Sequence, residues 1–508
     1  MSTEPRGATL EVDIAILGAG AAGLYAALCA VREGARVVLV SATALAQTAS
    51  YWAQGGLAAA LAGGDSPELH LADTERAGRG AVRRSAAEVL VREAPECVRD
   101  LQALGVRFDA DRYGRLALGL EGGHSARRVV HAGGSATGRR LVRELSARVV
   151  GEPRITVLEN TRARALQVTD ERCRAVACED GRVVLARALL LGTGGAAAMW
   201  ARTTNPPGSQ GVGLLLAHAA GAALADLELV QFHPTAVIGL PGREGFLGTE
   251  AIRGEGATLH DASGERFVDE LAPRDEVSRA IHARLAATGA QSVGLDMRAI
   301  DPTLFPNVVG ALREAGLDPV RELIPVAPAA HYTMGGIATD LHGRSTLAGL
   351  YALGESSCTG LHGANRLASN SLSECFVFAR RAVRSALEEP PASPPRSDAD
   401  LAALAARPAP PLADAPTRAA LMRDAGIERS AEGLQRLTRS DHPLVRLIAR
   451  SALARQESRG AHLRVDHPET DPALDRLHAV FAGVEQAGVD RVGEARAESD
   501  GLRWERWD

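Results

Sequence analysis

Five side chains that can hold an anionic ligand lie in short, turn-like segments of this sequence: His233, Thr249, Arg274, His331 and Arg366. Binding and catalytic residues are often found in such segments, and a guanidinium forms short, bidentate hydrogen bonds with a carboxylate. A single His or Arg is most often a surface residue or a satisfied core residue, so the inference depends on their recurrence. The segments are 231–235 (QFHPT), 249–256 (TEAIRGEG), 272–275 (APRD), 330–336 (AHYTMGG) and 363–372 (GANRLASNSL).

A glycine motif near the N-terminus predicts a site for a dinucleotide. The pattern G-x-G-x-x-G lies between an apolar strand, 12–17, and a helical segment, and its glycines are Gly18, Gly20 and Gly23. These glycines allow a tight turn and a close approach of backbone to a pyrophosphate, which the N-terminus of the helix then faces. The alternative is an ordinary glycine turn. No Asp or Glu follows the second strand, 36–40, which argues against a plain NAD dehydrogenase.

A second glycine pair favours the close approach of a flat ring. Gly55 and Gly56 lie within 47–61 (QTASYWAQGGLAAAL), a stretch too rich in small residues for an ordinary helix start. Without a Cβ, both positions let backbone lie directly against a ligand. The alternative interpretation is a loop without a ligand.

The elements that must position these residues form several domains, because 508 residues exceed what one core can hold. Two more apolar runs, 188–195 and 349–355, end in glycine like buried parallel strands. Their wide separation predicts a nucleotide-binding domain interrupted by an insert with many turns. A Pro-rich connector and a helical segment follow. The expected limits are 1–225 with 335–388 for the nucleotide-binding domain, 226–334 for the insert, 389–411 for the connector and 412–508 for the helical domain.

The composition excludes several classes of protein. All 57 basic residues are Arg, so neither a pyridoxal phosphate enzyme, which needs a Schiff-base Lys, nor a P-loop protein fits. The six cysteines form no C-x-x-C pair, so we expect no metal centre. A net charge of −5 with both signs interspersed favours neither nucleic acid nor a membrane surface. With no signal-peptide pattern or spanning segment, we expect a cytoplasmic protein.

Taken together, these motifs resemble the flavoprotein superfamily of succinate dehydrogenase, fumarate reductase and L-aspartate oxidase. The resemblance extends over about residues 11–470, includes 457–462 (ESRGAH), and preserves the order of six separated motifs. It implies an α/β fold: a Rossmann-like FAD-binding domain interrupted by an α+β capping domain and followed by a C-terminal helical bundle.

Two features separate the members of this superfamily. The electron-transport members carry FAD on a His five residues before the acid or amide of the glycine pair, and the corresponding position here, counted from Gln54, is Ala49. We therefore expect FAD to be bound without a covalent link. The segment 121–125 (EGGHS) resembles the L-aspartate oxidases, and its Glu121 could pair with a substrate ammonium group; the alternative is an exposed loop carboxylate. Rival hypotheses are a fumarate reductase or succinate dehydrogenase subunit and a non-enzymatic dinucleotide-binding scaffold.

The resemblance also implies roles for particular residues. Arg366 and His331 would hold one substrate carboxylate, and His233 and Thr249 the other. Arg274 matches the residue that the family uses as its acid/base. Because deprotonating an arginine at neutral pH is costly, we expect Arg274 to act as proton relay and electrostatic stabiliser. The implied FAD contacts are Gly18, Ala19, Gly20, Ala21, Ala22, Gly23, Ser41, Ser50, Tyr51, Trp52, Ala53, Gln54, Gly55, Gly56, Thr193, Gly194, Glu355, Ser371 and Leu372. The implied reaction oxidises L-aspartate to iminoaspartate, with oxygen (giving hydrogen peroxide) or fumarate as acceptor. This is the first step of NAD biosynthesis, functionally coupled to quinolinate synthase.

Overall fold

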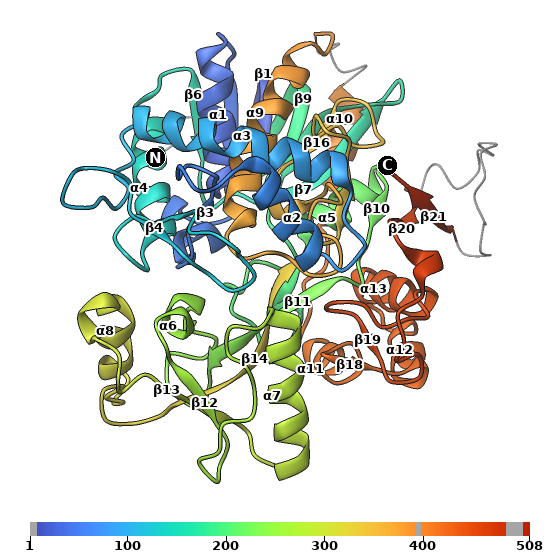
Figure 1. The fold of residues 1–508 in the computed structure, drawn as a ribbon. Coiled ribbons are helices and arrows are strands. Elements are labelled where there is room, and N and C mark those ends of the chain that lie inside the picture. The colour runs from blue at the N-terminus through green and yellow to red at the C-terminus, as the bar shows by residue number, and fades with distance from the viewer. Residues whose placement is uncertain (1–7, 392–397, 484–500) are drawn as a thin grey trace.

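A seven-stranded sheet carries the N-terminal glycine motif at the carboxyl end of an interior strand (Figure 1). The computed structural model describes residues 8–391, 398–483 and 501–508. Strands β6, β2, β1, β9 and β16 are parallel, and β8 and β7 continue the sheet in antiparallel pairing. The bounds are β1 (Thr9–Leu17), β2 (Val37–Val40), β6 (Ile155–Leu158), β7 (Ala163–Thr169), β8 (Arg172–Cys178), β9 (Val183–Leu191) and β16 (Leu350–Ala352).

Helices cover both faces of this sheet because its strands are apolar on both sides. Ile14 and Ile16 of β1 pack with one group of helices, while Ala15 and Leu17 face a second group. This alternation is what the two-residue repeat of a strand requires. The first group is α1 (Ala21–Arg32), α3 (Arg84–Ala103), α4 (Thr137–Gly151) and α9 (Asn370–Leu387), and the second includes α5 (Val212–Ala219).

The insert forms a separate lobe with its own core, and we call it the cap (Figure 1). Its antiparallel sheet has the order β11-β14-β13-β12, and its helices pack on that sheet. The bounds are β11 (Val230–Val237), α6 (Glu250–Gly254), β12 (Thr258–His260), α7 (Arg274–Thr288), β13 (Val293–Asp296), α8 (Pro306–Glu314) and β14 (Ile324–Thr333). Strands β11 and β14 run back to the large domain (Figure 1). At the end of β14, the Thr333 hydroxyl accepts from the N–H of Ala196 at 3.3 Å, in the segment that follows β9.

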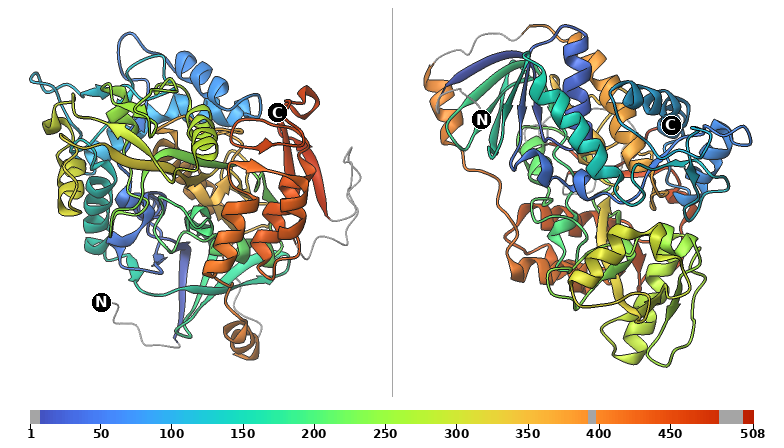
Figure 2. Two further views of the ribbon diagram at one scale, coloured as in Figure 1. Left: turned by 90° about the horizontal axis from the view of Figure 1, so that it is seen from below. Right: turned by 90° about the vertical axis from the view of Figure 1, so that its left-hand side faces the viewer.

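The C-terminal part contains the expected helices and also strands that the sequence analysis did not predict. Helices α11 (Ala415–Asp424), α12 (Ala431–Leu437) and α13 (Pro443–Ala454) pack beside the cap (Figure 2). Beyond them, β20 (Leu477–Phe481) and β21 (Leu502–Arg506) extend a five-stranded sheet with β10 (Leu224–Ala225), β15 (Gly336–Ala338) and β17 (Ser357–Cys358). A helical bundle therefore describes only the first half of this segment.

The Pro-rich connector also contains regular structure. Its residues 398–406 form α10 (Asp398–Ala406), and Leu404 is buried against β7 and β8. Part of the connector therefore adds to a core, whereas its Pro-rich composition predicted a semi-rigid connector outside any core. The remaining short elements are β3 (Leu57–Ala58), α2 (Pro67–Ala77), β4 (Leu118–Gly119), β5 (Val129–Val130), β18 (Glu428–Arg429) and β19 (Leu463–Arg464). The fold class is as expected, whereas the limits of the domains stay a prediction.

Candidate active site

The glycine motif forms the tight turn and close backbone packing that its residue types predicted. Gly18 has φ of +105°, and a Cβ there would collide with the carbonyl of Gly192. A Cβ on Gly23 would collide with the carbonyl of Gly18. Only glycine fits either position, so the turn after β1 lies against the turn after β9 and against the start of α1. The first turn of α1 then faces a ligand with backbone N–H groups that have no partner within the helix.

Several buried polar atoms around this turn have no partner within the described chain, as expected where a polar cofactor binds. The hydroxyl of Thr193 and the amide oxygen of Gln54 are two of them. The Ser50 hydroxyl accepts from the N–H of Ala21 at 3.0 Å, which fixes the second glycine segment over the first. Burial raises the pKa of Glu355 to about 7, so this carboxyl group can also donate a hydrogen bond. These atoms fit a group that carries phosphates, hydroxyls and a ring with polar edges.

The other residues implied for FAD divide into two groups. Gly194 belongs to the turn after β9. Gly55 and Gly56 lie beside the start of α9, where the N–H of Gly56 donates to the Ser369 hydroxyl at 3.1 Å. Ser371 and Leu372 are in the first turn of α9, where N–H groups have no partner within the helix. Three side chains point elsewhere. Trp52 is 60% exposed, Tyr51 accepts a hydrogen bond from Arg143, and the Ser41 hydroxyl donates to the carbonyl of Thr43. Contacts of these three with a cofactor would use their backbone.

Arg366 is a buried cation without an anionic partner among the described residues. Its side chain is 4% exposed, its Nη1 donates to the Ser371 hydroxyl at 2.6 Å, and its Nε makes no hydrogen bond. The guanidinium carbon lies 4.5 Å from the centre of the Tyr332 ring. Burial and the nearby Arg274 lower the pKa of Arg366 to about 10, so it remains charged at neutral pH. An unpaired buried charge is costly, and a ligand carboxylate would remove that cost.

The two predicted histidines lie together next to this arginine. The rings of His233 and His331 are 5.1 Å apart. Burial, followed by the charge of Arg274, holds the pKa of both well below the usual value, so both are neutral. The N–H of Thr235 donates to Nδ1 of His233 at 3.3 Å, which leaves the proton of that ring on Nε2. The Thr204 hydroxyl is 2.7 Å from Nδ1 of His331. Both rings are thus held as neutral hydrogen-bonding groups.

Arg274 belongs to a chain of charged groups. Its Nε and Nη2 donate to one carboxylate oxygen of Glu250 at 2.9 and 2.6 Å, and the other oxygen accepts from Arg253 at 3.1 Å. Burial raises the pKa of Glu250, but the two guanidiniums outweigh it and hold the pKa below its usual range. One buried carboxylate therefore bridges two buried guanidiniums. With Arg366, the site carries an excess of positive charge.

Glu121 lies at the same site with its carboxylate oriented by two donors. Its side chain is 3% exposed. Ser369 donates to one oxygen at 2.6 Å, and Nε2 of His131 lies 3.3 Å from the other. Although burial raises it, these contacts lower the pKa of Glu121 to about 2. The alternative of an exposed loop carboxylate does not agree with this burial.

Several residues of the site were not singled out from the sequence. Glu250 and Arg253 are three residues apart on α6, a spacing that places them on one face of a helix, and this signal was available. The Gln231 amide accepts from Arg274 at 2.9 Å and donates to the carbonyl of Arg366 at 2.9 Å. It thereby ties the two arginines together. No local pattern indicated Gln231 or Ser369, since their partners are distant in sequence, and none indicated His131, which lies ten residues from Glu121.

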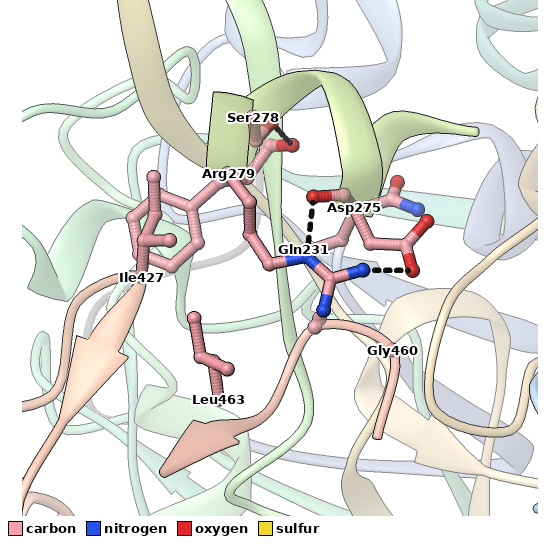
Figure 3. Close-up of a pocket in the computed structure, with 9 residues that line it drawn as sticks. Gln231, Asp275, Ser278, Arg279, Ile427, Gly460 and Leu463 are labelled. Atoms are coloured by element: carbon pink, nitrogen blue, oxygen red, sulfur yellow. Dashed lines mark hydrogen bonds and ion pairs between the residues drawn. The ribbon is translucent and has the colours of Figure 1, made fainter. Parts of the chain in front are cut away.

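Beside the first turns of α7, a small gap lies between the cap and the C-terminal domain (Figure 3). Ile427, Gly460 and Leu463 face Asp275 and Arg279 of α7 across this gap. An adjoining cleft of about 280 Å³ contains Arg79, whose guanidinium donates to both oxygens of Asp275 at 3.2 Å. Because Asp275 follows Arg274 directly, this ion pair fixes the start of α7 to the FAD-binding domain.

Comparisons with known proteins define the class. A family model described as an FAD binding domain matches residues 13–372, and one described as the fumarate reductase flavoprotein C-term matches residues 442–493. An Escherichia coli quinol fumarate reductase structure superimposes with a TM-score of 0.85 at 29% identity, covering 98% of this chain and 96% of that one. The protein is thus a flavoprotein of the succinate dehydrogenase and fumarate reductase type, and its cofactor is FAD.

Sequence relatives narrow the assignment further. An L-aspartate oxidase of Caulobacter vibrioides is 47% identical over 92% of this chain and 96% of its own length. One of Streptomyces coelicolor is 40% identical over 93% of this chain and 92% of its own length. The chain belongs to the L-aspartate oxidase family. In the described part of the chain, we find no helix with the length and apolarity needed to cross a bilayer.

Proposed function

We propose that this protein oxidises L-aspartate to iminoaspartate, with oxygen or fumarate as electron acceptor. The observation that carries the proposal is the buried, charged Arg366, which has no anionic partner in the described chain and lies beside a second buried guanidinium, Arg274. One carboxylate of a four-carbon dicarboxylate supplies the anionic partner that Arg366 lacks, and the second would lie near Arg274, which is already paired with Glu250. An uncharged substrate would leave Arg366 uncompensated.

The residues present define how aspartate would be held. Arg366 binds one carboxylate, assisted by His331. His233, through its Nε2–H, and the Thr249 hydroxyl bind the second carboxylate, and Glu121 accepts from the ammonium group. Each hydrogen bond to a charged group is typically worth about 1.5–3 kcal/mol. Three anchoring points on a four-carbon molecule fix its orientation, because rotation about any one of them breaks contact with the other two.

Arg274 and Glu250 then form the path for the proton that must leave the substrate. When bound, FAD accepts the two electrons of the oxidation. The guanidinium of Arg274 stabilises charge that develops near the substrate. Its hydrogen bonds to Glu250 give the proton a path to that carboxylate. The Arg253–Glu250–Arg274 chain leads from the substrate into the cap. We propose Arg274 as relay and electrostatic stabiliser, supported by its two hydrogen bonds to Glu250.

A direct test is to add L-aspartate to the purified flavoprotein without oxygen. The visible absorbance of the flavin should disappear within seconds, and adding fumarate or air should restore it. D-aspartate is the matched control, since it cannot satisfy the three anchoring points at once. A flavin that stays oxidised in excess L-aspartate would contradict the proposed function.

We predict that the flavin is not covalently attached. The position expected to carry the linking His is Ala49, and no His occurs between residues 47 and 61. Precipitation of the protein with acid should leave the yellow colour in the supernatant, as measured by flavin absorbance in each fraction. Colour retained in the pellet would instead favour a subunit of the electron-transport type, whose histidyl link raises the flavin potential.

We further propose that the reaction serves NAD biosynthesis in the cytoplasm. Iminoaspartate is unstable in water, so a second enzyme must use it promptly. Quinolinate synthase is the partner that this chemistry suggests. The test is quinolinate formation by the two proteins together, compared with the same synthase supplied with iminoaspartate that has aged in buffer.

A further inference from the structure

The contacts of Glu121 raise a question that the proposed function leaves open. Its buried carboxylate is suited to the ammonium group of aspartate, yet fumarate has no such group. With fumarate bound, Glu121 would be a buried anion facing an anionic ligand, which is strongly unfavourable. Some other cation must then neutralise it.

His131 is the side chain placed to supply that cation. It follows β5 (Val129–Val130), and its Nε2 lies 3.3 Å from a carboxylate oxygen of Glu121. The His131 side chain is 17% exposed, whereas that of Glu121 is 3% exposed. His131 therefore connects the buried carboxylate with water, from which it can take up a proton and to which it can release one.

The other titratable groups around His131 and Glu121 cannot exchange a proton to neutralise Glu121. The carboxylate of Asp109, which faces His131 from the preceding loop, is bound by the N–H groups of Gly133 and Gly134. Nε2 of His124 lies 2.9 Å from the Ala368 carbonyl, and its Nδ1 accepts from Arg128 at 3.3 Å. Burial lowers the pKa of His124. The Glu250 carboxylate is already bridged by two guanidiniums.

We propose that His131 is a specificity-determining residue whose proton substitutes for the substrate ammonium group at Glu121. When aspartate binds, its ammonium group becomes the partner of Glu121, and His131 releases one proton to water. When fumarate binds, His131 keeps or takes up that proton. The net charge around Glu121 is the same in both complexes, which allows one site to accept both ligands. This inference rests on the proposed function.

The exchange gives pH dependences of opposite sign. Burial alone would lower the pKa of His131, but the hydrogen bond and charge of Glu121 raise it above the ordinary value. Aspartate binding releases a proton, so its apparent affinity should fall tenfold for each pH unit below this pKa. Fumarate needs the protonated ring, so its affinity should fall tenfold for each unit above it.

Other titrating groups do not reproduce this pattern. The pKa values of His233 and His331 lie well below the usual value, so both rings stay neutral over the pH range tested. The pKa of Arg366 is about 10, so this side chain stays charged over that range. Glu355 has a pKa of about 7. It contacts Thr333 on the cofactor side, away from the ammonium position, and its titration should shift both ligands in the same direction.

The experiment measures both ligands from about pH 5.5 to 8.5. For aspartate the quantity is kcat/KM, and for fumarate it is the Kd for the oxidised flavoprotein, followed by the perturbation of the flavin spectrum. The wild type should give opposite slopes. In His131→Gln, which keeps a donor but cannot be charged, kcat/KM for aspartate should lose its slope, and the fumarate Kd at low pH should rise at least tenfold.

Two further variants make the outcome decisive. In Glu121→Gln no anion remains to be neutralised, so the fumarate Kd should become independent of pH. His342→Gln changes an exposed histidine and should retain both wild-type slopes. Slopes of the same sign in the wild type, or opposite slopes that persist in His131→Gln, would overturn the inference while aspartate oxidation itself stands. Absence of aspartate turnover in the wild type would overturn the proposed function instead.

Discussion

Replacing Arg366 with Met should lower kcat/KM for L-aspartate by about 10³-fold. The substitution keeps an unbranched side chain but removes both charge-assisted hydrogen bonds to one substrate carboxylate. At about 2 kcal/mol each these amount to about 4 kcal/mol, and each 1.36 kcal/mol is tenfold in rate. The carboxylate would also enter a buried site without its cation. Steady-state oxidation of aspartate, coupled to detection of hydrogen peroxide, measures the effect.

The matched control is Arg384→Met on α9, the helix that begins just after the segment carrying Arg366. Arg384 is exposed near the C-terminal end of that helix, so kcat/KM should stay within twofold of the wild type. Because Arg366 donates to Ser371 beside the expected flavin position, the flavin content of both variants must be compared. An Arg366→Met protein with full flavin and near-normal kcat/KM would remove Arg366 from substrate binding.

The sequence predicted best those features whose physical cause is local. Gly18 and Gly23 must be glycine because their Cβ atoms would collide with backbone, and this requirement follows from the residue types alone. The alternation of Ile14 and Ile16 with Ala15 and Leu17 between two helical layers likewise follows from an apolar strand covered on both faces. Such features need no knowledge of distant segments.

Features that depend on distant pairing were not predicted. Strand β20 joins the sheet through antiparallel pairing with β10, more than 250 residues earlier in the chain. Its own short apolar run, Leu477–Phe481, is too brief for its periodicity to identify a partner. Likewise, Leu404 is buried only because β7 and β8 present an apolar surface to α10. A Pro-rich composition around a helix says nothing of where that helix docks.

The active site shows the same division. His233, His331, Arg274 and Arg366 were singled out from their types and segments, and the structure brings these four together. Their binding of an anion, and that of Thr249, stays a prediction. Their charge states could not be predicted, because these depend on neighbours. Glu250 stays ionised between two guanidiniums, whereas His233 and His331 are neutral beside Arg274. The pairing of Glu121 with His131 was missed for this reason, although only ten residues separate them.

Replacing Arg274 with Leu should abolish the reduction of fumarate to succinate, with a loss of at least 10³-fold, and should lower aspartate oxidation by about 10²-fold. A positioned acid or base typically contributes about 10²–10⁴-fold. Fumarate reduction must place a proton on carbon, which a positioned proton donor has to supply. Aspartate oxidation removes a proton from nitrogen, which needs less assistance. Parallel assays of the two reactions on one preparation measure the ratio.

Leucine also leaves Glu250 with Arg253 as its remaining guanidinium partner, and removing one member of a buried ion pair can cost about 3–5 kcal/mol. Arg274→Lys therefore serves as a second variant: it keeps a positive charge near Glu250 but cannot donate from two nitrogens, so it should fold normally and still lose most fumarate reduction. Arg321→Leu, on an exposed part of the cap with its side chain 84% accessible, is the matched control for a lost arginine.

If Arg274→Leu binds flavin and reduces fumarate at the wild-type rate, the proton reaches the substrate by a route that does not include Arg274. If both reactions fall equally in Arg274→Lys, this residue acts through binding or charge, and the distinction between carbon and nitrogen as proton partners fails.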